Sequence, residues 1–444
     1  MLLFFLFFIL GVIFGLSYFF SKNKFSPEKL LLSLWLLAIG VAQLRLSPLE
    51  QGWNWQFWLL LVLFFSVFII VYLLSRKFFK ERIAARVRTA SIKEKLMLIV
   101  LLLMTVTSLA ANYYIFSIFG TLPILSSVPD KLRFIINRQV FGAWEYLSLL
   151  PRIYIPLTFI FLLISRPKKS WLRWLLIGNI ILGFAILSLY ASRLIMVITI
   201  LLCYFSYLIW KIKTVNFRQI IISAVIVVLI ISTLAVSIPA FRQYITYRDY
   251  HGADEGYNPF TYITSLARLN IPASLNFITP LYLIPSFNLQ AMMRSVDYLP
   301  VHGYYLGNYN LSVFNPLLKI FHLPQLSAKV DWQGIFQPWW NTATFLFDYF
   351  ADFGWPGIIM AAVFWGVLLS LVYVWAIKKS SLLSVMLFAY FSFTVIMSIY
   401  INYFSRPEMY LDLALIFIFG LILENKSENK KSRQLSVGGL DVKG

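Results

Sequence analysis

Two carboxylates, Asp348 and Asp352, lie four residues apart in the otherwise apolar and aromatic stretch NTATFLFDYFADFGWPG, residues 341–357. Residues four apart on an α-helix share one face, with about 5–6 Å between their Cβ atoms. A pair of this kind can hold an arginine, orient hydroxyl groups or accept a proton. The letters DFG also occur in protein kinases, but a glycine-rich phosphate loop, a strand lysine and an HRD loop are all missing from this sequence. The pattern therefore excludes a kinase.

Arginine is the second residue type whose positions suggest chemistry. Arg193 lies in LYASRLIM between two apolar runs, and Arg406 lies in NYFSRPEMY at the start of the last apolar run. Guanidinium groups bind phosphate oxygens through paired hydrogen bonds. A charge at the edge of a bilayer core is costly unless it faces a polar cavity, although a single arginine can also extend to the lipid headgroups. Together with Arg268 and Arg294, these residues predict an outward-facing cavity for an anionic, lipid-linked substrate.

The composition identifies a membrane protein. The 444 residues are 60% hydrophobic and only 13% charged, whereas a soluble domain carries about 25% charged residues. Apolar runs long enough to cross the ~30 Å hydrocarbon core occur near 1–20, 27–46, 55–75, 96–119, 148–165, 171–189, 194–210, 218–238, 355–376, 382–402 and 408–424. We therefore expect an all-α polytopic integral membrane protein with about 11 transmembrane helices.

The distribution of positive charge predicts the orientation of these helices. Most lysines and arginines fall in alternate connecting segments, at 21–29, 76–95, 166–173, 211–218, 378–379 and 425–444. Short basic segments stay in the cytoplasm, which places the N-terminus outside and the C-terminus inside. The first apolar run has no basic residues before it, so we interpret it as a retained helix. The net charge of +20 is explained in this way, and no nucleic-acid partner is expected.

The domain organisation follows from the same pattern. Residues 1–424 form one membrane domain, and residues 425–444 form a polar cytoplasmic tail that we expect to be disordered. The outer loop at about 239–340 contains all three histidines, and loops of this length are usually functional. Prolines interrupt its apolar part, 259–296, which predicts short helices that lie flat on the outer leaflet or re-enter it.

Several kinds of chemistry are excluded by motifs that the sequence lacks. It has no Asp-x-Asp pair, Walker loop, HExxH or GxSxG, and its one cysteine, Cys203, allows neither an intramolecular disulfide nor a cysteine-based metal site. We therefore expect neither a cofactor nor a metal. The energy for any reaction must come with the substrate or from a gradient.

The chain resembles the Wzy-type O-antigen and oligosaccharide repeat-unit polymerases of bacterial membranes. The features that carry the resemblance are the apolar helices, the outer turn YASRLIM, one large outer loop late in the chain with LPVHGYYLGNYN, and the segment NTATFLFDYFADFGWPGIIM that leads into the next helix. The resemblance covers the architecture over nearly the whole length.

The resemblance implies a reaction at the outer face of the bacterial cytoplasmic (inner) membrane. Such enzymes transfer a growing glycan from undecaprenyl pyrophosphate to a new lipid-linked repeat unit and so build O-antigen, capsule or exopolysaccharide. The implied partners are the undecaprenyl-pyrophosphate-linked oligosaccharide, membrane lipids, and the chain-length regulator and flippase of the same pathway. No metal or nucleotide is needed if arginines neutralise the charge that develops on the pyrophosphate.

This reaction assigns expected roles to the residues singled out above. The candidates for pyrophosphate binding are Arg193, as the first choice, with Arg268, Arg294 and Arg406. A histidine or carboxylate must accept the proton of the attacking hydroxyl, and the candidates are His302, Asp348 and Asp352. We favour His302, which lies in a glycine-rich turn beside two tyrosines. For Asp352 a structural role at the Gly-Trp-Pro-Gly break is the preferred interpretation.

Two other classes of function are compatible with the same sequence. An O-antigen ligase would share the architecture and differ only in its acceptor. A transporter or flippase of the lipid-linked sugar would need discontinuous helices and charges near the bilayer midplane, whereas almost every charge here falls at the end of an apolar run. A purely structural membrane protein is disfavoured by the long outer loop.

Overall fold

The computed structural model describes residues 2–20, 25–83, 92–122, 126, 143–165, 167, 169–190, 192–211, 217–251, 259–326, 329–337, 339–340 and 342–424. The described part of the chain is all-helical, with one isolated bridge between Ile92 and Glu424. The tail at 425–444, predicted to be disordered, lies outside the described residues.

A helix is present at each of the apolar runs found in the sequence. These helices are α1 Leu2–Phe20, α2 Pro27–Ala42, α3 Trp55–Arg82, α4 Glu94–Phe119, α6 Ala143–Ser148, α7 Pro151–Ser165, α8 Ser170–Ser188, α9 Arg193–Lys211, α10 Phe217–His251, α16 Phe345–Lys379, α17 Leu382–Met397 and α18 Pro407–Leu423. Within the described ranges, 6 helices are long and apolar enough to cross a membrane, namely α3, α4, α6 with α7, α8, α9 and α16. The chain therefore has the character of an α-helical membrane protein, and the count of about 11 spans stays a prediction.

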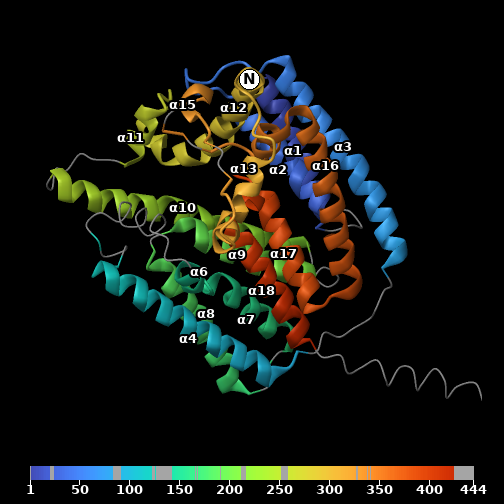
Figure 1. Cartoon of the computed structure of the whole chain (residues 1–444), viewed down its shortest axis with the longest axis vertical. Helices are drawn as coiled ribbons and strands as arrows, with labels where there is room; N and C mark the ends of the chain where they lie inside the picture. The colour runs from blue at the N-terminus through green and yellow to red at the C-terminus, as the bar shows by residue number, and fades with distance from the viewer. Residues whose placement is uncertain are drawn as a thin grey trace, which may run out of the picture.

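The outer-loop region forms a second group of helices. These are α11 Pro259–Leu266, η2 Ala273–Ile278, α12 Thr279–His302, α13 Asn308–Leu311, η3 Ser312–Phe314, α14 Asn315–Ile320 and α15 Trp332–Ile335. In Figure 1, α11, α12 and α15 lie together at the top of the molecule, beside the N-terminus. We call this group of seven elements the cap.

The prediction of only short helices at 259–296 was wrong for α12, which runs for 24 residues through Pro285. Pro280 occupies the first turn of the helix, where a backbone N–H has no partner to lose. Most of the helix is buried, so tertiary packing outweighs the hydrogen bond that Pro285 cannot donate. The prolines define the start of the helix without breaking it.

Close helix pairs form the core of the bundle. α16 packs along α3 (Figure 1), and a Cβ on Gly366 of α16 would lie 3.2 Å from the carbonyl oxygen of Phe68 in α3. α1 packs on α2 in the same way, since a Cβ on Gly40 would lie 3.1 Å from the backbone nitrogen of Phe8. Small residues allow backbones in membrane helices to approach closely.

Hydrogen bonds tie together the helix ends that the charge pattern places in the cytoplasm. The backbone N–H of Lys93, before α4, donates to the carbonyl of Leu423 at the end of α18 (3.0 Å). The ammonium group of Lys378, in the last turn of α16, donates to the carbonyl of Ile83 after α3 (2.6 Å). These contacts agree with the prediction that the basic segments share one side of the bundle.

The cap is attached to the loop between α2 and α3 through Glu50. This buried carboxylate accepts hydrogen bonds from the hydroxyl groups of Tyr282 and Ser286 in α12 and from the backbone N–H of Ser47 (2.9 Å). Burial raises the pKa of Glu50, and the hydrogen bond from Tyr282 opposes that shift. α12 is thereby fixed to the membrane bundle.

Candidate functional site

Asp352 lies beside a sharp bend in α16. At Gly354 the backbone leaves helical geometry, with a φ of 62° and a ψ of −139°. The buried carboxylate of Asp352 accepts hydrogen bonds from the backbone N–H groups of Tyr309 (3.0 Å) and Asn310 (2.9 Å) and from the side-chain amide of Asn310 (2.7 Å). Both carboxylate oxygens are occupied in holding α13 against the bend. This geometry favours the structural role for Asp352 over that of a base.

Asp348, one turn earlier in α16, connects the bend to the short helix η4 (Tyr403–Ser405). Its buried carboxylate accepts a hydrogen bond from the Ser405 hydroxyl. The side chain of Asn310 donates to the carbonyl oxygen of Asp348 (2.9 Å) and accepts from Asn402 (3.3 Å). Arg406, directly after η4, is close enough to interact with the Asp348 charge. Asp348, Asp352 and Arg406 therefore belong to one connected polar cluster.

Arg406 also borders a polar cavity of about 300 Å³ among the first turns of α7, α9 and α18. The cavity is lined by Glu145, Leu149, Arg152, Ser192, Leu194, Ile195, Ile198, Tyr400, Ile401, Tyr403, Arg406 and Glu408. The N-terminal ends of α9 and α18 both meet it. Helix N-termini carry partial positive charge and exposed N–H groups, which favour a bound anion. We call this space the polar cavity.

Arg193, the first choice for pyrophosphate binding, is the first residue of α9. Its chain neighbours Ser192 and Leu194 both line the polar cavity. The placement of the Arg193 side chain lies outside what the structure describes. The backbone position nevertheless brings Arg193 to the same cavity as Arg406, 213 residues later in the numbering (406 − 193).

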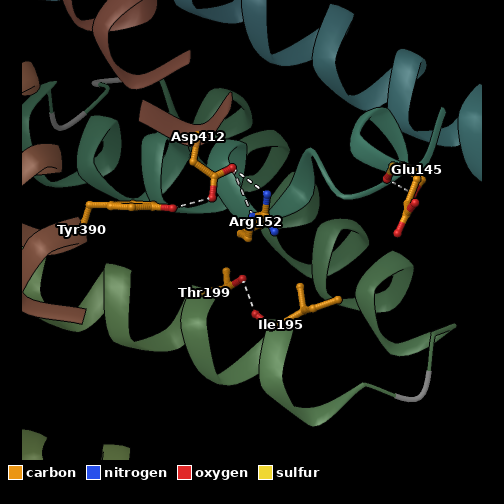
Figure 2. A network of polar contacts seen from close by, with 7 residues as sticks. Glu145, Arg152, Ile195, Thr199, Tyr390 and Asp412 are labelled. Atoms are coloured by element: carbon orange, nitrogen blue, oxygen red, sulfur yellow. Dashed lines mark hydrogen bonds and ion pairs between the residues drawn. The ribbon is translucent and has the colours of Figure 1, made fainter. Parts of the chain in front are cut away.

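A buried ion pair forms one wall of the polar cavity. The guanidinium of Arg152 in α7 donates two hydrogen bonds to the Oδ1 atom of Asp412 in α18 (2.7 and 3.2 Å), and the hydroxyl of Tyr390 in α17 donates to Oδ2 (2.9 Å). Figure 2 shows Asp412 between the other two side chains, with all three helices meeting at this point. Three helices that are distant in sequence are locked together behind the cavity.

The sequence interpretation gave neither Arg152 nor Asp412 a role. The available signal was Asp412 itself, a carboxylate inside the apolar run of α18. Ionisable residues within such runs are rare, and they usually pair with one another or line a cavity. Arg152 lies in the equally apolar α7 and is the matching cation.

Two carboxylates line the polar cavity and were also missed as candidates. Glu145 in α6 and Glu408 in the first turn of α18 are close enough to repel each other electrostatically. Among the described residues, the buried Oε2 atom of Glu408 has no hydrogen-bond partner. A buried acceptor without a partner is costly, so this oxygen is open to a donor that enters the cavity. Its position in NYFSRPEMY, two residues after Arg406, was the available signal.

His302, the preferred base, lies in the cap and not among the residues of the polar cavity. It ends α12, is exposed, and its ring stacks on that of Tyr298 with 3.7 Å between ring centroids. The Tyr298 hydroxyl donates to the carboxylate of Asp331 (2.8 Å). The backbone N–H of Gly334 also donates to Asp331, and this bond lowers the pKa of the carboxyl. His302 is thus part of an aromatic surface on α12 and α15.

Two of the candidate arginines also lie in the cap. Arg294 donates to the carbonyl of Leu49 (2.9 Å) and lies 4.9 Å from the ring centroid of Phe336, and burial lowers its pKa. Arg268 follows α11, is exposed, and has a φ of 50°. Neither belongs to the lining of the polar cavity. Arg294 therefore helps to attach the cap, as Glu50 does.

The structure thus divides the candidate residues between two places. Arg193, Arg406 and Asp348 lie in or next to the polar cavity, Asp352 supports the neighbouring bend, and the remaining candidates lie in the cap. Arg152, Glu145 and Glu408 also line the cavity, and Asp412 binds Arg152 behind it. Comparisons with protein-family models, curated proteins and solved structures found no match to this chain.

Proposed function

We propose that this chain is a glycosyltransferase that polymerises undecaprenyl-pyrophosphate-linked oligosaccharide repeat units on the outer face of the cytoplasmic membrane. The observation that carries the proposal is the polar cavity, where arginine, helix N-termini and carboxylates meet at the ends of membrane helices. The resemblance to Wzy-type polymerases supplies the substrate class. The products would be O-antigen, capsule or exopolysaccharide, and the N-terminus would lie outside and the C-terminus in the cytoplasm.

In the proposed reaction, a hydroxyl oxygen of the acceptor sugar attacks the anomeric carbon of the donor glycan. The bond between that carbon and the pyrophosphate oxygen breaks, and its electron pair leaves with undecaprenyl pyrophosphate. Arg193 and Arg406 contact the pyrophosphate and offset the negative charge that develops on it. The N-terminal ends of α9 and α18 act in the same direction.

The proton of the attacking hydroxyl passes to Glu408. This carboxylate lines the polar cavity and has a buried oxygen with no hydrogen-bond partner in the described part of the chain, so it can accept from a substrate hydroxyl. Asp352 has three hydrogen-bond donors already, and Asp348 is bound by Ser405. The location of Glu408 makes it a better base than His302, whose ring stacks on Tyr298 in the cap.

The test is the glycan produced by a strain that lacks the gene. A polymerase predicts molecules that carry a single repeat unit, and the wild-type chain restores the ladder of longer products. Long chains that stay unattached to lipid A core would show a ligase, and lipid-linked repeats that accumulate on the inner face would show a flippase. Purified protein supplied with lipid-linked repeats should form polymer in excess EDTA without a nucleotide. A strict requirement for Mg²⁺ or Mn²⁺ would contradict the arginine mechanism.

A further inference from the structure

The part of the cap from the end of α12 to just beyond α14 exposes several large apolar side chains. Those that are at least 50% exposed are Val301, Leu306, Leu311, Phe321 and Leu323. Residues 301–326 contain no aspartate or glutamate, and Lys319 is their only lysine or arginine. Exposed apolar side chains that are concentrated in this way mark an interaction surface. We call residues 301–323 the apolar segment.

The apolar segment is attached to the bend in α16. The backbone N–H of Leu306 donates to the carbonyl oxygen of Asp352 (3.0 Å), and that of Tyr305 donates to Ala351 (2.9 Å). Pro356, four residues after Asp352, has no N–H with which to bond that carbonyl in the helix. The apolar segment supplies the missing donor, so Leu306 lies at the level of the bend.

The length of α16 indicates where this bend lies relative to the membrane. From Trp355, directly after the bend, α16 continues to Lys378 and Lys379 in its last turn. These 25 residues (379 − 355 + 1) extend for roughly 37 Å at a rise of ~1.5 Å per residue, which is enough to cross a hydrocarbon core of ~30 Å. With the lysines among the cytoplasmic headgroups, as the charge pattern predicts, the bend lies at the outer boundary of the core.

The apolar segment also adjoins the exposed surfaces of two apolar helices. A Cβ on Gly307 would lie 3.4 Å from the Cζ atom of Phe353 in α16, and both Phe353 and Met360 of α16 are exposed. Phe314 packs on Tyr410 in the first turns of α18, with 5.2 Å between their ring centroids. The segment therefore rests on the outer ends of α16 and α18, and its exposed side chains extend the apolar surface of a membrane-spanning helix.

We propose that the apolar segment lies in the outer leaflet, where Val301, Leu306 and Phe321 contact phospholipid acyl chains close to the headgroups. The inference does not depend on the proposed function. A segment without carboxylates avoids repulsion by lipid phosphates, and tyrosines such as Tyr304 and Tyr305 are enriched at membrane interfaces. Contact with lipid would hold α13, whose backbone N–H groups bind Asp352, against the bend.

The test places a nitrobenzoxadiazole label at single cysteines in a Cys203→Ser background. Leu306→Cys and Phe321→Cys probe the apolar segment, Met360→Cys is the control for lipid contact, and Gln333→Cys, exposed on α15, is the aqueous control. The full-length protein is reconstituted in phosphatidylcholine vesicles, with and without bromine near the headgroup end of the acyl chains. We expect the labels at positions 306, 321 and 360 to emit at shorter wavelength than the label at 333. In brominated vesicles they should also lose most of their intensity.

Three outcomes decide between lipid, water and protein as the surroundings of the apolar segment. Short-wavelength emission that bromine quenches at positions 306 and 321 supports the inference. Emission at either position that matches the label at 333 would overturn it, because the segment would then face water. Short-wavelength emission without quenching would also overturn it, because a protein surface such as a second copy of the chain would cover the segment. None of these results requires the chain to make polymer, so failure of the proposed function is distinguished from failure of this inference.

Discussion

Arg152 and Asp412 form an ion pair that is nearly inaccessible to solvent, with relative side-chain exposures of 5% and 2%. Only one carboxylate oxygen, Oδ1, accepts both guanidinium hydrogen bonds, because Oδ2 is taken by the hydroxyl of Tyr390. The pair therefore binds α7 to α18 and, through Tyr390, to α17. Arg152 also lines the polar cavity, so the pair supports one wall of it.

Removal of one partner of this pair should destabilise the protein more than removal of both. Asp412→Ala leaves a buried guanidinium without its counter-ion, at a cost of about 3–5 kcal/mol. The double variant Arg152→Met with Asp412→Leu should recover much of that loss, because no buried charge remains. The measurement is the thermal midpoint of the detergent-purified protein, with the exposed Arg268→Met as the control. A double variant no more stable than Asp412→Ala would show that the pair is not a closed electrostatic unit.

The polymerisation rate should depend on both the charge and the shape of the side chain at position 193. Lysine keeps the charge but lacks the planar fork that binds two phosphate oxygens at once. Arg193→Ala should lower the polymerisation rate by roughly 10²–10³, the cost of losing one such donor in other enzymes, and Arg193→Lys should recover only part of it. Arg268→Ala and Arg268→Lys, in the cap, are the matched controls. Normal product lengths in both Arg193 variants at equal expression would remove Arg193 from the site.

Glu408→Gln should abolish most of the activity while it leaves the carrier bound. Glutamine keeps the size and one acceptor oxygen but cannot take the proton, and a positioned base contributes roughly 10²–10⁴ to rate. Glu145→Gln is the matched control, because it lines the same cavity but has no assigned proton-transfer role. Rates and undecaprenyl pyrophosphate binding are compared on the same preparations. Equal rate losses in the two variants would contradict the assignment of Glu408 as base.

The bend in α16 should tolerate no side chain at Gly354. A Cβ there would lie 2.9 Å from the Cζ atom of Tyr304, and the φ of 62° with ψ of −139° is open essentially to glycine alone. Gly354→Ala should cost on the order of 1–3 kcal/mol from backbone strain, before the clash is added. Gly178→Ala, where a Cβ would meet nothing within 4 Å, should be neutral or stabilising in the same thermal assay. Equal stability of the two variants would show that the bend is not constrained.

The predicted orientation can be tested by cysteine labelling in a Cys203→Ser background. Gln333 in α15 and Glu81 in α3 are both exposed positions, predicted to lie outside and inside respectively. An impermeant maleimide applied to whole cells should label Gln333→Cys and leave Glu81→Cys unlabelled until the cells are opened. The reverse pattern would place the polar cavity in the cytoplasm and remove the basis of the proposed reaction.

The sequence predicted where the helices lie better than it predicted the site. Long apolar runs such as 55–75 and 96–119 are local signals, and α3 and α4 occupy them. Arg193 and Arg406 were also found locally, as charges at the ends of such runs. The partner of Arg152 lies 260 residues away, and no periodicity within either helix indicates that the two helices touch.

The incorrect prediction for α12 and the preference for His302 both rested on local signals. The rule that proline ends helices is local, whereas the burial that sustains α12 through Pro285 comes from its neighbours. His302 stood out because the sequence has only 3 histidines and this one lies in a glycine-rich turn. Glu408, in a motif already noted for its arginine, has the more suitable surroundings only because α7 and α9 are placed beside it.

The polar cavity can be completed only late in synthesis, because α18 supplies part of its lining. Arg152 is synthesised 260 residues before its counter-ion in α18, a delay of roughly 13–50 s at 5–20 residues per second. During this time α7 is in the membrane with a charge that its final neighbour has not yet compensated. Arg406 and Glu408 arrive with the same late helix, so a nascent chain halted before α18 lacks one wall of the cavity. Completion of the polar cavity is thereby coupled to insertion of the last helix that the structure describes.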